Sequence, residues 1–297
     1  MFDEKIICAA ISAATDSEFL LASSKPIMGG DINQAHRLEG RCGRQFFLKL
    51  NRTEKLDMFI AETEGLLELV QTKAIRVPIP VCHGQAGQHA YLVLEYIEFA
   101  SGDTSAARQL GQQLAQLHQF NSAGRGYGWH RDNTIGATPQ LNDWSNQWTA
   151  FLSEQRLGYQ LRLASNNGAN KALLDKGQRL LSGLDCYFEA YVPEASLLHG
   201  DLWSGNAGFD VTGRPVIYDP AVYYGDRESD IAMTELFGGF STDFYTAYEQ
   251  VWPLDSGYSK RRDLYKFYHI LNHFNLFGGG YASQADHILD KLLIYLP

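Results

Sequence analysis

One short segment, residues 197–210, constrains this chain more than any other. It reads LLHGDLWSGNAGFD, in which an apolar entry leads into His199, Asp201 and Asn206. Thirteen residues after Asn206, a second β-like apolar run, VIYDPA, ends on Asp219. With this spacing, the Asp201 carboxylate can accept a proton. The Asn206 amide and the Asp219 carboxylate supply hard oxygen atoms of the kind that Mg²⁺ prefers. The chain must therefore fold so that short strands deliver these side chains to one site.

The spacing of His199, Asp201 and Asn206 matches the H-R-D-x-x-x-x-N catalytic loop of protein kinases, with Gly200 in place of the Arg. Asp219 occupies the place of the second metal-binding carboxylate. We expect Asp201 to orient an attacking hydroxyl and accept its proton, and Asn206 and Asp219 to be metal ligands. We expect His199 to be structural and to bond the loop backbone.

A lysine and a glutamate upstream fit the same interpretation. Lys49 ends the β-like run RQFFLK, as the phosphate-pairing lysine of V-A-I-K does. The next helical pattern offers Glu62 and Glu64 as partners for it. Helical spacing places Glu62 beside the apolar stripe and turns Glu64 towards solvent. A carboxylate at the border of a buried face needs a partner, so we predict that Lys49 pairs with Glu62.

Two further segments are candidates for nucleotide contacts. MGGDIN is a candidate phosphate-covering turn, because glycines let backbone N–H groups approach phosphate oxygens closely. VLEYIEF has the position of an interlobe hinge, where the backbone of Glu95 and Ile97 would bond an adenine edge. The full set of predicted nucleotide-binding residues is Gly29, Gly30, Asp31, Ile32, Asn33, Lys49, Glu62, Glu95, Tyr96 and Ile97.

The order of the patterns predicts an α+β, protein-kinase-like fold of two lobes. Residues 1–98 read as a small, β-rich, nucleotide-binding lobe with one helix, whose start we place at a capping box of Asn51 and Glu54. Residues 99–297 read as a larger, mainly helical, catalytic lobe, and a cleft between the lobes is the expected ligand site. After Asp219, the residues Asp226, Arg227, Glu228 and Asp230 are expected to form an ion-paired anchor.

Composition limits the classes of function. The 297 residues carry a formal net charge of -9, which argues against a sequence-independent nucleic-acid binder. Four scattered cysteines form no zinc or disulfide pattern, so we expect a reducing, cytoplasmic setting. No stretch has the length and apolarity of a membrane span, and no membrane partner is expected. The oligomeric state stays open.

Three segments, LLHGDLWSGNAGF, YDPAVYYGDRESDIAMTELFGGF and LNHFNLFGGGY, closely resemble the fructosamine kinase family. The resemblance covers essentially the whole chain. It implies ATP- and Mg²⁺-dependent phosphorylation of the 3-hydroxyl of ketoamine sugars on protein lysines or small amines, a deglycation step. It also implies that Asp201 is the base and that Trp203 borders the substrate, with His273 and Asn275 as further candidates.

Two alternatives remain at this stage. One is a phosphotransferase of the same fold acting on an aminoglycoside- or choline-like alcohol. The other is a non-catalytic nucleotide-binding protein, which the presence of Lys49, Asp201 and Asp219 disfavours. Nothing in the residues selects among fructosamine, ribulosamine and erythrulosamine substrates.

Overall fold

The structure, a computed structural model, describes residues 2–28 and 32–296. The chain forms two compact units. The first comprises Met1–Ala106 and Gly208–Asp219, and the second comprises Ala107–Ala207 and Pro220–Pro297. The first unit thus runs past the expected boundary at residue 98 and takes a segment from the expected second lobe. It does so because β10 (Ala207–Asp210) pairs with β6 (Phe99–Ala100).

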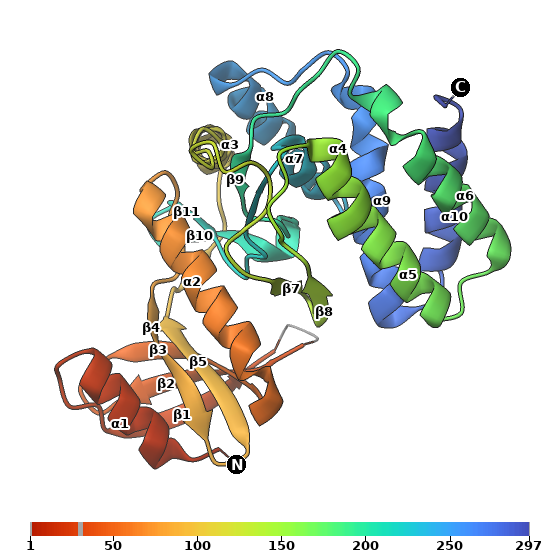
Figure 1. Cartoon of the computed structure of the whole chain (residues 1–297). Helices are drawn as coiled ribbons and strands as arrows, with labels where there is room; N and C mark the ends of the chain where they lie inside the picture. Colours follow the sequence, from red (N-terminus) through yellow and green to blue (C-terminus); the bar gives the residue numbers. More distant parts are fainter. Residues whose placement is uncertain (1, 29–31, 297) are drawn as a thin grey trace. The chain divides into compact units, whose positions relative to one another are not determined.

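The first unit is built on a five-stranded antiparallel sheet (Figure 1). Its strands, in spatial order, are β1 (Leu21–Ile27), β2 (Gln34–Gly40), β3 (Gln45–Arg52), β5 (His89–Glu95) and β4 (Pro80–Ala86). A tight turn at residues 41–44 joins β2 to β3, and within it Gly43 adopts φ +82°, which glycine tolerates without strain.

The two faces of this sheet follow from the alternation of side chains along β3. Leu48 and Leu50 lie in a core cluster with Ile7 and Ile11 of α1 (Glu4–Ala14). Lys49, between them in the sequence, points to the other face, where its ammonium meets α2 (Leu56–Thr72). A period of two therefore buries the leucines against α1 and aims the lysine at α2.

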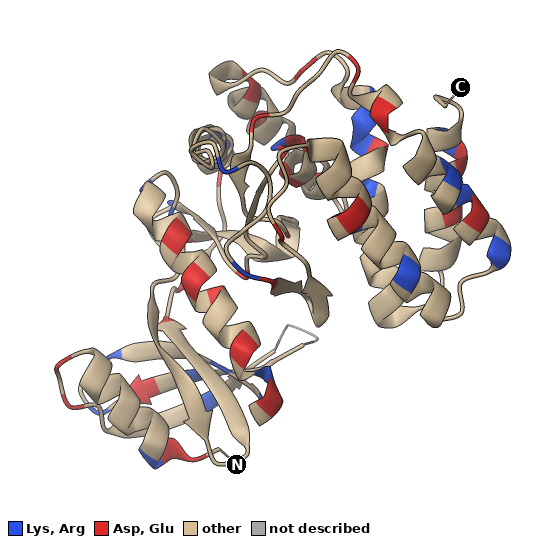
Figure 2. Ribbon diagram, viewed as in Figure 1, with Lys and Arg blue, Asp and Glu red and all other residues tan. Residues whose placement is uncertain are grey.

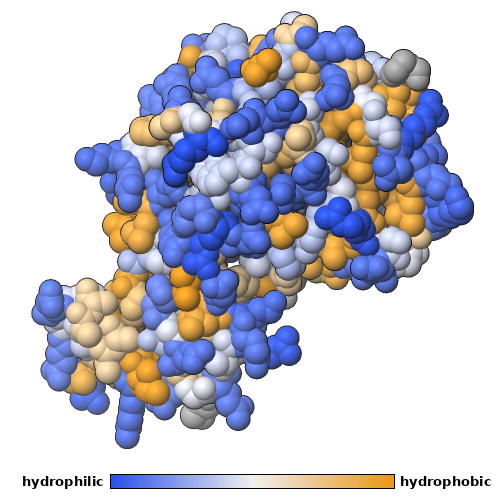
Figure 3. Space-filling view, in the orientation of Figure 1, coloured by the Kyte–Doolittle hydropathy of each residue, from blue (hydrophilic) through white to orange (hydrophobic). Residues whose placement is uncertain are grey.

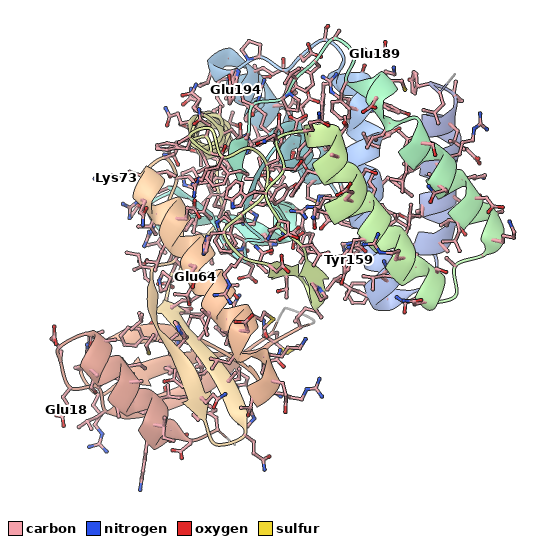
Figure 4. All side chains as sticks on the ribbon, viewed as in Figure 1. Glu18, Glu64, Lys73, Tyr159, Glu189 and Glu194 are labelled. Atoms are coloured by element: carbon pink, nitrogen blue, oxygen red, sulfur yellow. The ribbon has the colours of Figure 1, made fainter. Side chains whose placement is uncertain are left out.

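Helix α2 begins differently from the prediction. A 3₁₀ turn, Thr53–Lys55, precedes it, and Asn51 does not cap it. The Asn51 carboxamide instead donates to Ile32 O at 3.1 Å and to Asn33 Oδ1 at 2.7 Å. The expected capping box is therefore wrong, because tertiary hydrogen bonds engage the asparagine. The helix ends at Lys73, a left-handed C-cap with φ +55°, labelled in Figure 4.

A small second sheet completes the first unit. Its strands lie in the order β11 (Pro215–Ile217), β10, β6. Arg76, in the segment after α2, links this sheet to the rest of the unit, since its carbonyl accepts from Ile217 N at 3.0 Å. Its guanidinium bonds Asp210 and, at 2.5 Å, Glu95. The residues just before Asp219 are thereby fixed within the first unit.

The second unit is mainly helical (Figure 1). Helix α9 (Tyr258–Phe277) contacts α5 (Gly158–Asn166), α7 (Glu228–Thr234) and α10 (Tyr281–Leu293) and is buried along much of its length. The remaining helices are α3 (Thr104–His118), which starts in the first unit, α4 (Trp148–Phe151), α6 (Lys171–Ser182) and α8 (Thr242–Val251). Short strands form two antiparallel pairs, β7 (Asn133–Ile135) with β8 (Thr138–Gln140) and β9 (Ser196–Leu198) with β12 (Tyr223–Gly225).

The surface carries both signs of charge. Lys and Arg are interspersed with Asp and Glu on both units (Figure 2). The face drawn in Figure 3 is predominantly hydrophilic, with apolar areas in both units. No helix in the part of the chain that the structure describes is both long and apolar enough to cross a membrane.

Candidate active site

An ion-paired triad in the first unit joins three of the predicted residues. Lys49 Nζ lies 2.6 Å from Glu62 Oε1 and 2.7 Å from Asp219 Oδ1. Lys49 is 4% exposed, so its charge depends on these two carboxylates. The predicted pairing with Glu62 is confirmed. Glu64, labelled on α2 in Figure 4, is half-buried, and its expected exposure to solvent is not found.

Burial and charge act in opposite directions on this triad. Desolvation lowers the pKa of the Lys49 ammonium, but the charges of Asp219 and Glu62 outweigh it and the pKa is raised. Burial raises the pKa of the Glu62 carboxyl, and the Lys49 ammonium opposes that rise. Lys49 therefore stays a fixed cation at neutral pH, as a group that pairs with phosphate must be.

Asp219 combines a strained backbone with an accessible side chain. Its φ is +58°, unusual for a residue other than glycine, and its side chain is 45% exposed. One carboxylate oxygen accepts from Lys49, which leaves the second for another cation. Such strain persists only where neighbouring contacts hold the backbone, and it concentrates at functional sites.

The predicted nucleotide segments are described in part. Gly29, Gly30 and Asp31 lie outside the described residues. Ile32 and Asn33 are held by the Asn51 carboxamide. In the predicted hinge, the N–H of Glu95 donates to Ile79 O at 2.8 Å, so an adenine edge would have to meet its carbonyl oxygen. The Tyr96 ring faces the Arg37 guanidinium at 5.6 Å, and Ile97 is buried.

The catalytic-loop segment in the second unit is anchored by one carboxylate. Asp230 on α7 accepts from His199 N at 2.7 Å and from Gly200 N at 2.9 Å. Gly200 has φ +84°, and a Cβ there would lie 2.0 Å from the Ala221 carbonyl oxygen. Ala221 N in turn donates to His199 O at 2.8 Å. Only glycine fits at position 200 because two stretches of backbone meet there.

Within the loop, the predicted residues are hydrogen-bonded to one another. Asp201 N donates to His199 Nδ1 at 3.3 Å, so the expected structural role of His199 is confirmed. Asn206 Nδ2 donates to Asp201 O at 2.9 Å and to Asp201 Oδ2 at 3.3 Å. The Asn206 amide oxygen therefore faces away from Asp201, and amide and carboxylate oxygens are the donors that Mg²⁺ prefers.

A buried hydrogen-bond network holds the Asp230 carboxylate in place. His118 Nε2 lies 3.2 Å from Asp230 Oδ2, and His118 Nδ1 lies 2.8 Å from the Tyr248 hydroxyl. Burial lowers the pKa of the His118 imidazole despite the neighbouring carboxylate, so the ring is neutral and donates through Nε2. Arg227 donates to the same Tyr248 hydroxyl at 2.9 Å.

Comparison with known proteins decides the family. The family model described as fructosamine kinase matches residues 3–295. A probable ketoamine kinase of Synechocystis sp. is 46% identical over 97% of this chain and 96% of its own length. A chloroplastic protein-ribulosamine 3-kinase of Arabidopsis thaliana is 42% identical over 97% of this chain and 90% of its own length. The chain belongs to the fructosamine kinase family.

Solved structures agree with this fructosamine kinase assignment. A crystal structure from Haemophilus somnus 129PT, described as a candidate fructosamine-3-kinase, superposes with a TM-score of 0.89 at 29% identity, covering 97% of this chain and 96% of that one. An aminoglycoside phosphotransferase superposes with a TM-score of 0.66 at 15% identity, covering 97% and 98% of the two chains. The second likeness shows the fold alone, and the predicted α+β kinase-like fold is confirmed.

The predicted substrate residues of this fructosamine kinase family member separate into two groups. The Trp203 and Phe237 ring centroids lie 5.9 Å apart, and those of Phe237 and His273 lie 4.6 Å apart. Phe237, which the sequence prediction missed, joins the other two from a left-handed backbone position with φ +52°. Asn275 is engaged elsewhere, because its amide donates to Gln160 of α5 at 2.7 and 3.0 Å.

The expected ion-paired anchor after Asp219 is only partly as predicted. Glu228 pairs with Arg261 at 2.7 Å, whereas Asp226 accepts from the Tyr191 and Tyr265 hydroxyls. The Arg227 guanidinium donates to backbone carbonyls and a tyrosine, and Asp230 holds the loop. The four residues have different partners because Asp226 and Arg227 precede α7, whereas Glu228 and Asp230 lie on its first turn and point in different directions.

Proposed function

We propose that this chain is an ATP-dependent ketosamine 3-kinase. The observation that carries the proposal is the hydrogen-bonded Asp201–Asn206 pair in HGDLWSGN, in a chain that matches the fructosamine kinase family from end to end. The names of the relatives, ketoamine kinase and protein-ribulosamine 3-kinase, support a sugar attached to an amine as the acceptor. Neither name favours an aminoglycoside or choline acceptor or a non-catalytic role.

In the proposed reaction, Asp201 accepts a hydrogen bond from the 3-hydroxyl of the ketosamine. As the new oxygen–phosphorus bond forms, the bond between the γ-phosphorus and the leaving ADP oxygen breaks, and the hydroxyl proton passes to Asp201. A carboxylate is a weak base towards an alcohol, so Asp201 takes the proton late, after bonding to phosphorus has developed.

Lys49 is the proposed partner of the nucleotide phosphates, and Glu62 keeps its ammonium in place. Asn206 and Asp219 would hold Mg²⁺, which neutralises phosphate charge when bound. Among the described residues, no three His, Cys, Asp or Glu side chains cluster as a metal site. An amide and a single carboxylate are nonetheless sufficient where phosphate oxygens and water complete the shell of the ion.

The proposed acceptor side uses the aromatic rings near Asp201. Trp203 and Phe237 offer faces on which a sugar and its protonated amine could pack, since a cation is attracted to an aromatic face. A 3-phosphorylated ketosamine is chemically unstable and would release its amine, so the proposed role is deglycation. We further propose a cytoplasmic location, which the four free thiols support.

The test is a panel of acceptors incubated with ATP and Mg²⁺. The panel contains fructosamine, ribulosamine and erythrulosamine adducts of lysine, 3-deoxy analogues of each, an aminoglycoside and choline. The expected result is phosphorylation of one or more ketosamines, detected by mass spectrometry and assigned to O3 by phosphorus-coupled NMR. The 3-deoxy analogues should not be phosphorylated. Phosphorylation of the aminoglycoside or choline alone would refute the proposal.

A further inference from the structure

The β7–β8 hairpin is an element of the second unit that the proposed reaction does not use. Its two strands are joined by Gly136 and Ala137, and Gly136 adopts φ +62°. Despite its small size, it carries a dense set of carboxamides: Asn133, Gln140 and, just beyond, Asn142. Gln140 and Asn142 are each 1% exposed, so these amides act inside the protein.

Two of these amides donate to the backbone that follows Asp219. Gln140 Nε2 donates to the Ala221 carbonyl at 3.0 Å, and Asn133 Nδ2 donates to the Val222 carbonyl at 2.8 Å. Pro220 has no N–H, so the first backbone N–H group after Asp219 belongs to Ala221. Ala221 N is also used, because it donates to His199 O.

The hairpin amides are themselves held in one orientation. Gln140 Oε1 accepts from the Tyr268 hydroxyl at 2.8 Å, and Asn133 Oδ1 accepts from Gln140 Nε2 at 2.9 Å. Asn133 Oδ1 also accepts from Asn142 Nδ2 at 3.0 Å. With their oxygens engaged, both amides must present their N–H groups to the carbonyls of residues 221 and 222.

A buried arginine fixes the far end of the hairpin. Arg156 comes from a π-helical turn, Leu152–Leu157, between α4 and α5, and it is fully buried. Its guanidinium donates to Asn142 Oδ1 at 2.8 Å and to Leu141 O at 2.5 Å. It also lies over the Tyr223 ring, 4.0 Å from the ring centroid, on the strand that follows Val222. Such turns are rare and frequently serve functional sites.

We infer that Gln140 and Asn133 are positioning residues for Asp219. They hold residues 221–222 so that Asp219 keeps its left-handed backbone and presents its second carboxylate oxygen to a cation. The inference rests on the proposed function in that it takes Asp219 to be a magnesium ligand. Each amide acts through the backbone two or three residues beyond Asp219.

The experiment measures ATP binding by calorimetry with and without Mg²⁺, and it does not depend on phosphoryl transfer. Gln140→Met keeps the length of the side chain and removes its amide, and so the hydrogen bond to Ala221 O together with those to Asn133 and Tyr268. We expect the Mg²⁺-dependent gain in ATP affinity to fall by about tenfold, the size of one lost buried hydrogen bond. The affinity for ATP without Mg²⁺ should stay within about twofold, because Lys49 and Glu62 are untouched.

Leu180→Ala is the matched control, since Leu180 is a fully buried core residue of α6. It should lower the melting temperature and leave the Mg²⁺-dependent gain unchanged. If Gln140→Met does not fold, Asn133→Ala at a half-buried position of the same hairpin replaces it, with the same expectation.

Three outcomes would overturn the inference. The parent protein could bind ATP equally well with and without Mg²⁺. The variant could keep the parent's full Mg²⁺-dependent gain in ATP affinity, or it could lose ATP affinity equally with and without Mg²⁺. A parent that binds Mg²⁺-ATP but phosphorylates no ketosamine would refute the proposed function and leave the positioning role intact.

Discussion

Lys49 Nζ and Asp219 Oδ1 lie 2.7 Å apart, although 170 positions separate the two residues in the sequence. The contact exists because the short strand β11 brings the residues before Asp219 into the unit that contains β3. With Glu62, the pair places two carboxylates around one buried ammonium. A triad of net charge -1 suits the proposed binding of a magnesium ion, and its ammonium suits the proposed contact with phosphate.

Lys49→Met tests the cation of this triad. We expect kcat/KM for ATP to fall by about a hundredfold or more, the usual cost of removing one preorganised electrostatic contact. The variant also leaves Glu62 buried without its cation, so it should unfold at a lower urea concentration than the parent. Lys49→Met/Glu62→Gln should recover part of that stability and none of the activity. A double variant no more stable than Lys49→Met would contradict this reading of the pair.

Asp201→Asn tests the proton acceptor. The substitution keeps the shape of the side chain and removes its basicity, so kcat should fall by about two to four orders of magnitude. ATP affinity measured by calorimetry should change by no more than a few-fold, because the substitution leaves the ion-paired triad of Lys49, Glu62 and Asp219 in place. Turnover close to the parent's would exclude Asp201 as the base.

Asp230→Asn tests the anchor of the catalytic loop. An asparagine can accept from only one of the two N–H groups, of His199 and Gly200, that the carboxylate now holds. We expect kcat to fall roughly ten- to a hundredfold with little change in KM for ATP. Asp226→Asn is the matched control, because Asp226 is an equally buried carboxylate bonded to Tyr191 and Tyr265. It should cost stability and leave kcat of the folded enzyme unchanged. Equal losses of kcat in both variants would argue against a specific anchor.

His269 predicts how stability depends on pH. Burial lowers the pKa of this imidazole from 6.5 to about 3, and its Nδ1 has no hydrogen-bond partner among the described residues. The unfolded chain takes up a proton below pH 6.5 and the folded chain does not. Stability is therefore complete above pH 6.5 and declines as the pH falls, by up to about 1.4 kcal/mol per pH unit for this one group.

Urea unfolding at pH 7.5, 6.5 and 5.5 gives the measurement for His269. His269→Phe should reduce the decline between pH 6.5 and 5.5, because the variant has one proton fewer to bind on unfolding. His287→Gln, at an exposed position of α10, is the control and should leave the slope unchanged. An unaltered slope in His269→Phe would contradict the assignment of a neutral, buried imidazole.

Much of the candidate active site could be predicted because the residues concerned lie close together in the sequence. The interval from His199 to Asn206 lies within one loop, and the choice of Glu62 over Glu64 needed only the helical period. These predictions depend on spacing, which the backbone translates directly into position.

What could not be predicted depends on contacts between distant segments. Asn51 is a plausible helix cap by sequence, but its carboxamide bonds Ile32 and Asn33 across the sheet. Phe237 gave no signal, because its position follows from a left-handed backbone before two glycines. Gln140 belongs to none of the motifs that indicated a site, because its role follows from a hydrogen bond to Ala221, 81 positions away. The boundary at residue 98 shifted because β6 pairs with a strand more than a hundred positions away.

The division of the first unit into Met1–Ala106 and Gly208–Asp219 has a consequence for biosynthesis. When the ribosome has released the amino-terminal segment, β6 still lacks its partner strand and Lys49 lacks one of its two carboxylates. The roughly one hundred residues of Ala107–Ala207 must be translated first, which takes about 5 to 20 seconds at ordinary elongation rates. During that interval Lys49 can pair only with Glu62, and the triad can form only after Asp219, residue 219 of 297, has been added.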